Sequence, residues 1–177
     1  WLKSEAESKK HDQVKVRLPR TDDEAESFSR GLKMLNLFYG SEKTHCWMLT
    51  KAIGSPRQYG ASGWCSTERV IGSVIKPTAH LLDLGKFVGQ EADISAYKTW
   101  NGVVQECTKS VRVPPISKGS FSSMIKRKVF TSGSDVDMVK GIYGSCFDDC
   151  IKTAKRLSFA RLDWDDTNME QLAAVLE

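Results

Sequence analysis

The hydrophobic positions of residues 22–39 recur at steps of three and four along the chain. This spacing places apolar side chains on one face of a helix. Thr21 and Glu24 fit a capping box at its start, and Gly40 stands where a helix terminus favours glycine. We therefore expect a helix over 22–39, with an apolar face formed by Ala25, Phe28, Leu32, Leu35 and Phe38.

Shorter patterns on both sides of this helix predict strands. Residues 14–18 alternate apolar and charged side chains, which is typical of a half-buried strand. Residues 44–50 are mostly apolar without clean alternation, which indicates a strand covered on both faces, as in a parallel sheet. A further helix is expected over 64–76, with Ser62 as its N-cap and Pro77 directly after it.

The second half of the chain continues this alternation of strands and helices. Its clearest break is the stretch 111–119, which contains Pro114 and Pro115. Ser134 and Asp137 form a second cap signature, at the start of a helix that should end near residue 154. The order favours an α/β fold in which a parallel sheet carries helices on both faces. The remaining elements expected here are a strand at 80–87, a helix at 91–107, a strand at 157–164 and a helix at 169–176.

Composition narrows the class of protein. The 177 residues carry 26 Lys and Arg against 22 Asp and Glu, a net charge of +4, and 40% of them are hydrophobic, which fits a soluble globular chain. No apolar run reaches the roughly 18 residues that a membrane-spanning helix needs. Five cysteines, an odd number with no regular spacing and no signal peptide before them, favour a reduced, cytoplasmic protein. Because the first residue is Trp1, we expect the fold to be incomplete at its N-terminus.

The most specific motif is the string from Tyr59 to Glu68, YGASGWCSTE. It resembles the Tyr-x-x-Ser-x-Trp-Cys-x-x-Glu segment of Toll/interleukin receptor (TIR) domains, above all those of the plant type. The resemblance implies a flavodoxin-like, TIR-like sheet and association with further copies or with other TIR-like domains. In family members that hydrolyse NAD at the nicotinamide–ribose bond, the glutamate that matches Glu68 is the catalytic acid. The matching positions expected to bind the substrate are Tyr59, Ser62, Trp64 and Cys65.

A carboxylate suits this chemistry because cleavage of a glycosidic bond builds positive charge on the ribose. The same residues also have structural explanations. The helix dipole alone favours a glutamate such as Glu68 in the first turns, and Trp64 is equally suited to packing at the helix start. Many TIR domains act only as assembly modules, so a non-catalytic protein-binding α/β scaffold is the alternative. No cofactor or metal site is expected, because neither a phosphate-binding glycine loop nor a zinc pattern occurs; NAD enters only as a substrate.

A second resemblance lies in residues 157–177. Their leucines and Trp164 are spaced as in one unit of the ribonuclease-inhibitor type of leucine-rich repeat, a strand followed by a helix. A single unit needs neighbours to bury its apolar face, so an ordinary terminal strand and helix is the alternative. The expected domains are a TIR-like core at 1–112, a helical extension at 113–156 and the repeat-like unit at 157–177.

Two weaker candidates remain outside these motifs. Cys146 and Cys150 share a helix face with apolar neighbours, which favours core thiols over a metal pair. Nucleic acid is only weakly indicated, because the densest basic cluster is short. That cluster is Lys126, Arg127 and Lys128. Taken together, the residues and the resemblance predict a cytoplasmic signalling module that self-associates, with NAD hydrolysis through Glu68.

Overall fold

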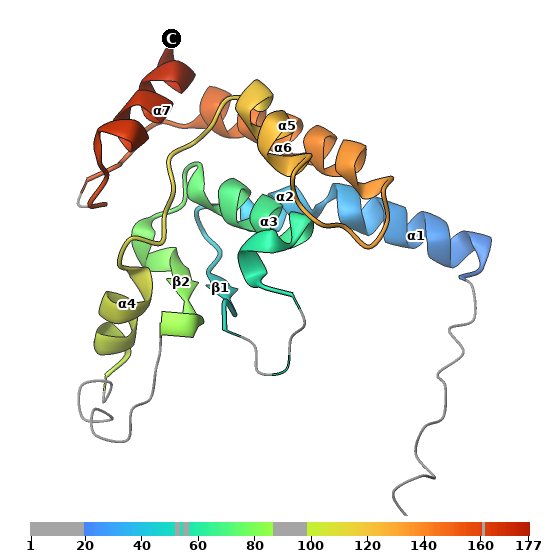
Figure 1. The fold of residues 1–177 in the computed structure, drawn as a ribbon, viewed down its shortest axis with the longest axis horizontal. Helices are drawn as coiled ribbons and strands as arrows, with labels where there is room; N and C mark the ends of the chain where they lie inside the picture. The colour runs from blue at the N-terminus through green and yellow to red at the C-terminus, as the bar shows by residue number, and fades with distance from the viewer. Residues whose placement is uncertain (1–19, 52–53, 55–56, 87–98, 161) are drawn as a thin grey trace, which may run out of the picture. The chain divides into compact units, whose positions relative to one another are not determined.

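The computed structural model describes residues 20–51, 54, 57–86, 99–160 and 162–177 (Figure 1). The strand predicted at 14–18 lies outside these ranges. The chain divides into two compact units, residues 1–32 and 33–177. Among the described residues, no helix combines the length and the apolar character required to cross a membrane.

Helix α1 (Asp22–Lys33) begins at the predicted capping box. The Thr21 amide donates to Glu24 Oε2 at 2.9 Å, and the Glu24 amide donates to Thr21 Oγ1 at 3.3 Å. A separate helix, α2 (Leu35–Tyr39), follows Met34, whose φ of −92° and ψ of −5° lie at the edge of the right-handed helical region. The helix predicted over 22–39 is therefore confirmed, except that it is interrupted at Met34.

Strand β1 (Cys46–Met48), helix α3 (Gly63–Ser73) and strand β2 (Leu81–Asp83) form a βαβ unit. The two strands pair in parallel, with Trp47 opposite Leu82. The fold is therefore mixed α/β, and the sheet has two strands in the described part of the chain. Trp47 is 60% exposed between two buried neighbours, so the expectation of a strand covered on both faces is wrong. Successive side chains point to opposite faces of a strand, and only one of those faces is covered by described residues.

Short 3₁₀ turns flank β2 on both sides. They are η3 (Thr78–His80) and η4 (Leu84–Lys86). The strand predicted at 80–87 is therefore confirmed only at β2, and 3₁₀ turns take up the described positions on either side of it. Helix α4 (Trp100–Thr108) follows, with the Gly102 amide donating to its N-cap Thr99 Oγ1 at 3.2 Å. The first part of the helix predicted at 91–107 lies outside the described residues.

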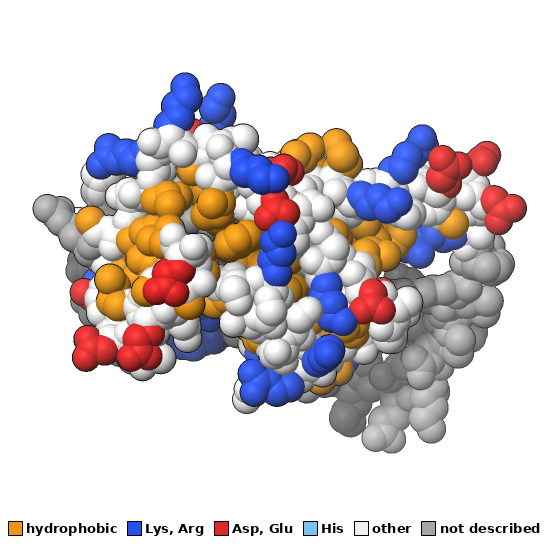
Figure 2. Space-filling view, turned by 90° about the horizontal axis from the view of Figure 1, so that it is seen from above, with side chains coloured by type: hydrophobic (Ala, Val, Ile, Leu, Met, Phe, Trp, Pro, Cys, Tyr) orange, Lys and Arg blue, Asp and Glu red, His pale blue; other side chains and the backbone are white. Residues whose placement is uncertain are grey.

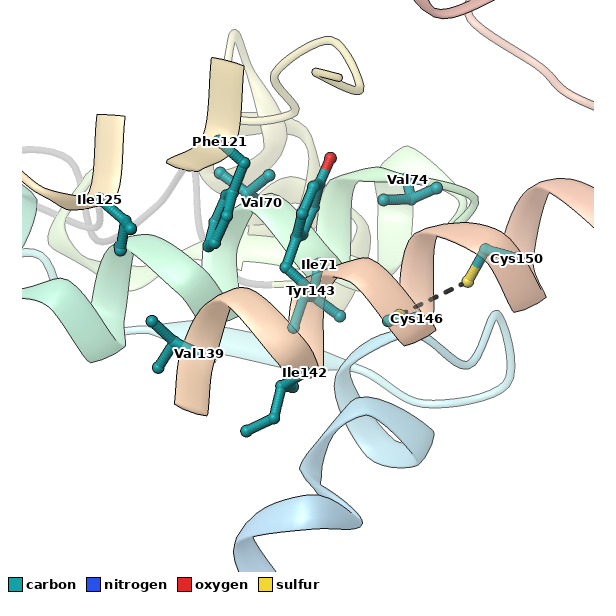
Figure 3. Close-up of a cluster of buried hydrophobic side chains, with 10 residues drawn as sticks. All are labelled: Val70, Ile71, Val74, Phe121, Ile125, Val139, Ile142, Tyr143, Cys146 and Cys150. Atoms are coloured by element: carbon teal, nitrogen blue, oxygen red, sulfur yellow. Dashed lines mark hydrogen bonds between the residues drawn. The ribbon is translucent and has the colours of Figure 1, made fainter. Parts of the chain in front are cut away.

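The largest buried cluster joins α3 to two later helices, α5 (Lys118–Ile125) and α6 (Asp135–Thr153) (Figure 3). The rings of Phe121 and Tyr143 stack with centroids 4.0 Å apart and planes 16° apart. Residues on both sides of the boundary expected at 112 therefore contribute to one core. Its members are Val70, Ile71, Val74, Phe121, Ile125, Val139, Ile142, Tyr143, Cys146 and Cys150.

Helix α5 lies where the sequence pattern predicts only a break and a short basic segment. It begins at Ser117, whose Oγ accepts a hydrogen bond from the Ser120 amide at 3.1 Å. The helix predicted from Ser134 is confirmed as α6, but its predicted cap is wrong. Ser134 itself has helical φ and ψ, and its Oγ lies 2.8 Å from Ser132 Oγ instead of meeting a backbone amide.

Arg112 connects the end of α3 to the C-terminal segment. Its side chain is 3% exposed and makes three hydrogen bonds to backbone carbonyl oxygens. Nε donates to Ser73 at 2.9 Å, Nη2 to Val74 at 3.1 Å and Nη1 to Ser158 at 2.6 Å. In return, Trp164 Nε1 donates to the Arg112 carbonyl oxygen at 3.0 Å. Burial lowers the pKa of Arg112 to about 10, which still leaves the guanidinium charged at neutral pH.

The strand predicted at 157–164 is wrong for the described residues of this segment, which are irregular. Asp163 has a positive φ of 52°, which breaks an extended run. The helix predicted after it is confirmed as α7 (Asp166–Leu176), which starts with a capping box between Asp165 and Asn168. The repeat-like unit therefore has its helix but no strand in these residues.

Candidate functional site

The motif of residues 59–68 begins in a 3₁₀ turn, η2 (Tyr59–Ala61), and continues into α3. Ser62 caps the helix as predicted, since its Oγ accepts a hydrogen bond from the Cys65 amide at 3.5 Å. The start of α3 is also tied to a distant segment, because the Gly63 amide donates to the Val129 carbonyl oxygen at 2.9 Å. These contacts fix the orientation of α3 and so the direction of the side chains that follow.

Glu68 lies on α3 and lines a cavity of about 210 Å³, which we call the Glu68 cavity. Its wall combines the end of α2, strand β1, the η2 turn and the first residue of β2. Segments that are far apart in sequence therefore meet around one carboxyl group. The residues that bear on its chemistry are Tyr39, Trp47, Leu49, Tyr59 and Arg69.

The electrostatics of the cavity are set by burial. Burial raises the pKa of Glu68, and a side-chain hydrogen bond with Tyr39 acts in the opposite direction. The pKa of Tyr39 is raised to about 12, first by burial and then by the nearby charge of Glu68. Burial, with the charges of Cys65 and Glu68, also raises the pKa of Tyr59. Both phenols are therefore neutral hydrogen-bond donors beside the carboxyl group at neutral pH.

The structure brings together two of the five residues that the motif proposes. Tyr59 and Glu68 share the cavity, whereas Ser62 faces its own helix as a cap. Trp64 packs against the α3–α5–α6 core, and its Nε1 donates to Asp135 Oδ2 at 2.9 Å. Cys65 is half-buried and is not among the described residues that line the cavity.

Three residues of the cavity have no clear signal in the sequence. Tyr39 ends the apolar pattern of a helix, and Trp47 belongs to a run that indicates a buried strand. Arg69 occupies a position expected on a helix surface, yet it is half-buried and its Nη2 donates to the Val111 carbonyl oxygen at 3.0 Å. Trp47 also packs near Trp100 of α4, with ring centroids 6.1 Å apart. These residues become neighbours only through the fold.

No protein-family model, no curated protein and no solved structure matches this chain. In the ranges that the structure describes, no group of three or more His, Cys, Asp or Glu residues is arranged to hold a metal ion. Cys146 and Cys150 lie in the core, as predicted, with their sulfur atoms 3.7 Å apart.

The raised pKa of Glu68 gives a testable dependence of stability on pH. A carboxyl group whose pKa is higher in the folded state destabilises the fold once pH rises above its ordinary value of 4.5. Glu68→Gln removes this effect while keeping the shape and an acceptor for Tyr39. We expect the variant to be more stable than the parent at about pH 7 and equal to it at about pH 4, measured by urea unfolding. Equal stability at both pH values would contradict burial of an ionisable group at this position.

Proposed function

We propose that the chain is a cytoplasmic signalling module, TIR-like in fold, that associates with a second copy of itself. The surface that supports this is an apolar patch at the mouth of the Glu68 cavity, formed by Trp47, Leu49 and Trp100, which we call the β1 patch. Their side chains are 60%, 64% and 52% exposed. Aromatic side chains of this kind are the usual anchors of protein interfaces.

Several features favour a second copy as the occupant of the β1 patch. The resemblance of residues 59–68 to TIR domains implies self-association. The two tryptophans come from different elements, β1 and α4, yet their rings are adjacent, so they present one continuous surface. Trp47 and Leu49 are two residues apart, and in extended backbone such residues point to the same side. All five cysteines are free, which fits a reducing compartment.

Sedimentation of the purified chain over a range of concentrations tests this proposal. We expect a monomer–dimer equilibrium that Trp47→Glu weakens by about 30-fold or more, the loss typical of a hot-spot residue. Met169→Glu on α7 is the matched control, since Met169 is also about half exposed but lies outside the patch. A parent that stays monomeric at all concentrations, or two variants that weaken association equally, would refute the proposed interface.

We further propose that the Glu68 cavity takes the nicotinamide–ribose end of NAD and that Glu68 promotes its hydrolysis. The supporting observation is a carboxyl group with a raised pKa that shares a cavity with Tyr59 and Tyr39. The bond between the ribose carbon and the nicotinamide nitrogen breaks, and its electron pair leaves with nicotinamide. Water then adds to the ribose carbon and loses one proton to the solvent. Glu68 stabilises the positive charge on the ribose, an effect that is strong where water is excluded.

Release of nicotinamide from NAD, measured over a range of protein concentrations, tests this activity. We expect release by the parent and none by Glu68→Gln, because the amide keeps the shape but loses the charge. Glu106→Gln is the control, because Glu106 lies on α4, is partly exposed and forms an ion pair with Lys109. This variant should release nicotinamide as the parent does. Release that is equal in the parent and in Glu68→Gln would overturn the role of Glu68. Release by neither protein, with self-association intact, would favour the non-catalytic scaffold.

We also propose that the fold is TIR-like. A parallel pair of strands joined through a helix is the repeating unit of flavodoxin-like sheets, so the β1–α3–β2 unit supports a TIR-like sheet with helices on both faces. The similarity to a leucine-rich repeat unit is supported only by its helix, α7, in which Leu172 is buried while Met169 and Leu176 are exposed, because the described residues of 157–164 form no strand.

A further inference from the structure

A second and larger cavity lies within residues 33–177, between α3, the loop at 113–117, α5 and α7. Its volume of about 600 Å³ falls in the range of sites that bind small molecules. We call it the α3–α7 cavity. None of the proposed NAD chemistry takes place there, since Glu68 lines only the smaller cavity, although Tyr59 and Arg69 line both.

One part of the α3–α7 cavity is apolar. Side chains from four separate segments form this part, which suits the flat or apolar body of a ligand. Figure 2 shows hydrophobic side chains gathered on the face that includes α7, with Lys and Arg side chains beside them. The apolar residues that line the cavity are Val70, Val113, Pro114, Ile116, Met124 and Ala174.

The polar part of the lining is strongly biased toward positive charge. Arg69, Arg127 and Lys128 line the cavity, and Glu170 is the carboxylate among its described lining residues. Lys128 Nζ donates to the Gly60 carbonyl oxygen at 2.6 Å, which holds the ammonium group in place and takes up one of its three donors. The guanidinium of Arg127 forms no ion pair with the described part of the chain.

Arg69 gives separate evidence for a bound ligand, because one of its buried donors has no acceptor among the described residues. Its Nη2 is bonded to the Val111 carbonyl oxygen, but its Nε is buried and has no hydrogen-bond acceptor among the described residues. A buried donor without an acceptor costs free energy, so this position favours a ligand that supplies one. An arginine also matches the geometry of phosphate oxygen atoms better than a lysine does.

We propose that the α3–α7 cavity binds a small phosphorylated ligand with an apolar ring, of which a nucleoside monophosphate is the simplest form. The ring lies against the apolar side chains, and the phosphate lies among Arg69, Arg127 and Lys128. Both halves of the ligand are needed: the ring buries apolar surface, and the phosphate, with up to about two negative charges, pairs with the cationic side chains.

Calorimetric titration of the full chain with AMP, adenosine and inorganic phosphate as separate probes tests this site. We expect AMP to bind at least about tenfold more tightly than either adenosine or phosphate alone, because adenosine lacks the charged hydrogen bonds of the phosphate and phosphate lacks the apolar contacts of the ring. Arg127→Gln should weaken AMP binding about tenfold and leave the binding of adenosine unchanged. Lys126→Gln is the matched control, because it removes the same charge one residue away and outside the described lining.

Three outcomes would overturn the proposal. They are no binding of AMP at millimolar concentration, equal binding of AMP and adenosine, and equal loss of AMP binding in Arg127→Gln and Lys126→Gln. The first outcome would show that the cavity does not bind AMP. The second would show that the phosphate is not recognised, and the third that AMP is attracted only by the general positive charge of this region. Glu68→Gln should keep the parent's affinity for AMP, so this result is separate from the success or failure of the NAD chemistry.

Discussion

Arg112→Met is expected to lower the free energy of unfolding by about 3 kcal/mol, because it leaves two buried carbonyl oxygens and one part-buried carbonyl oxygen without their charged donor. Those oxygens belong to Ser73, Val74 and Ser158, which lie 38 to 46 residues away in sequence. The lowered pKa of Arg112 shows that burial of its charge offsets part of the gain. The measurement is urea unfolding followed by tryptophan fluorescence, since Trp164 is bonded to the Arg112 backbone.

Arg112→Lys tests whether the stabilisation comes from the positive charge of Arg112 or from the geometry of its hydrogen bonds. A lysine keeps the positive charge but not the planar fork that reaches three acceptors, so most of the loss should persist. Arg156→Met is the matched control, because Arg156 is exposed and its removal should change stability by less than about 0.5 kcal/mol. A lysine variant as stable as the parent would show that the fork of hydrogen bonds is not what holds the C-terminal segment.

Features that depend on neighbours in sequence could be predicted from the sequence. The caps at Thr21 and Ser62 form because a hydroxyl group meets an amide three residues later, and both are confirmed. The apolar positions of α6 recur at helical spacing over enough residues to identify a helix without knowledge of what it packs against. In α5, by contrast, Phe121 and Ile125 are the buried positions, and the serines and glycine around them resemble a loop.

Features that depend on distant contacts could not be predicted. The segment 157–164 has the spacing of a strand, but Arg112 takes the Ser158 carbonyl oxygen that a neighbouring strand would use. The partners of Glu68 come from α2, β1 and η2, and each follows a local pattern that indicates packing. The motif at 59–68 therefore contains two residues that line one cavity, Tyr59 and Glu68, but it carries no information on Tyr39 or Trp47.

Gly63→Ala is expected to lower the free energy of unfolding by about 2 to 3 kcal/mol, because the added methyl group meets the ring of Phe130. An ideal Cβ at Gly63 would lie 2.1 Å from Phe130 Cζ, well inside any real contact. The ring is held there by the backbone, since the Val129 amide and carbonyl bond to Ala61 and Gly63. The measurement is urea unfolding, with Gly141→Ala as the control. Gly141 lies in helix α6, and nothing lies within 4 Å of a Cβ added there. The free energy of unfolding of this control should therefore rise by up to about 1 kcal/mol.

A double-mutant cycle shows whether the contact with Phe130 is the cause. Phe130→Ala alone should destabilise the chain, because its ring packs against the α3–α5–α6 core. In that background, Gly63→Ala should cost almost nothing, since the methyl group then has room. If the cost of Gly63→Ala is unchanged without the ring, a clash with Phe130 is not its cause. The cost would then come from the backbone at the start of α3, where the Gly63 amide is bonded to Val129.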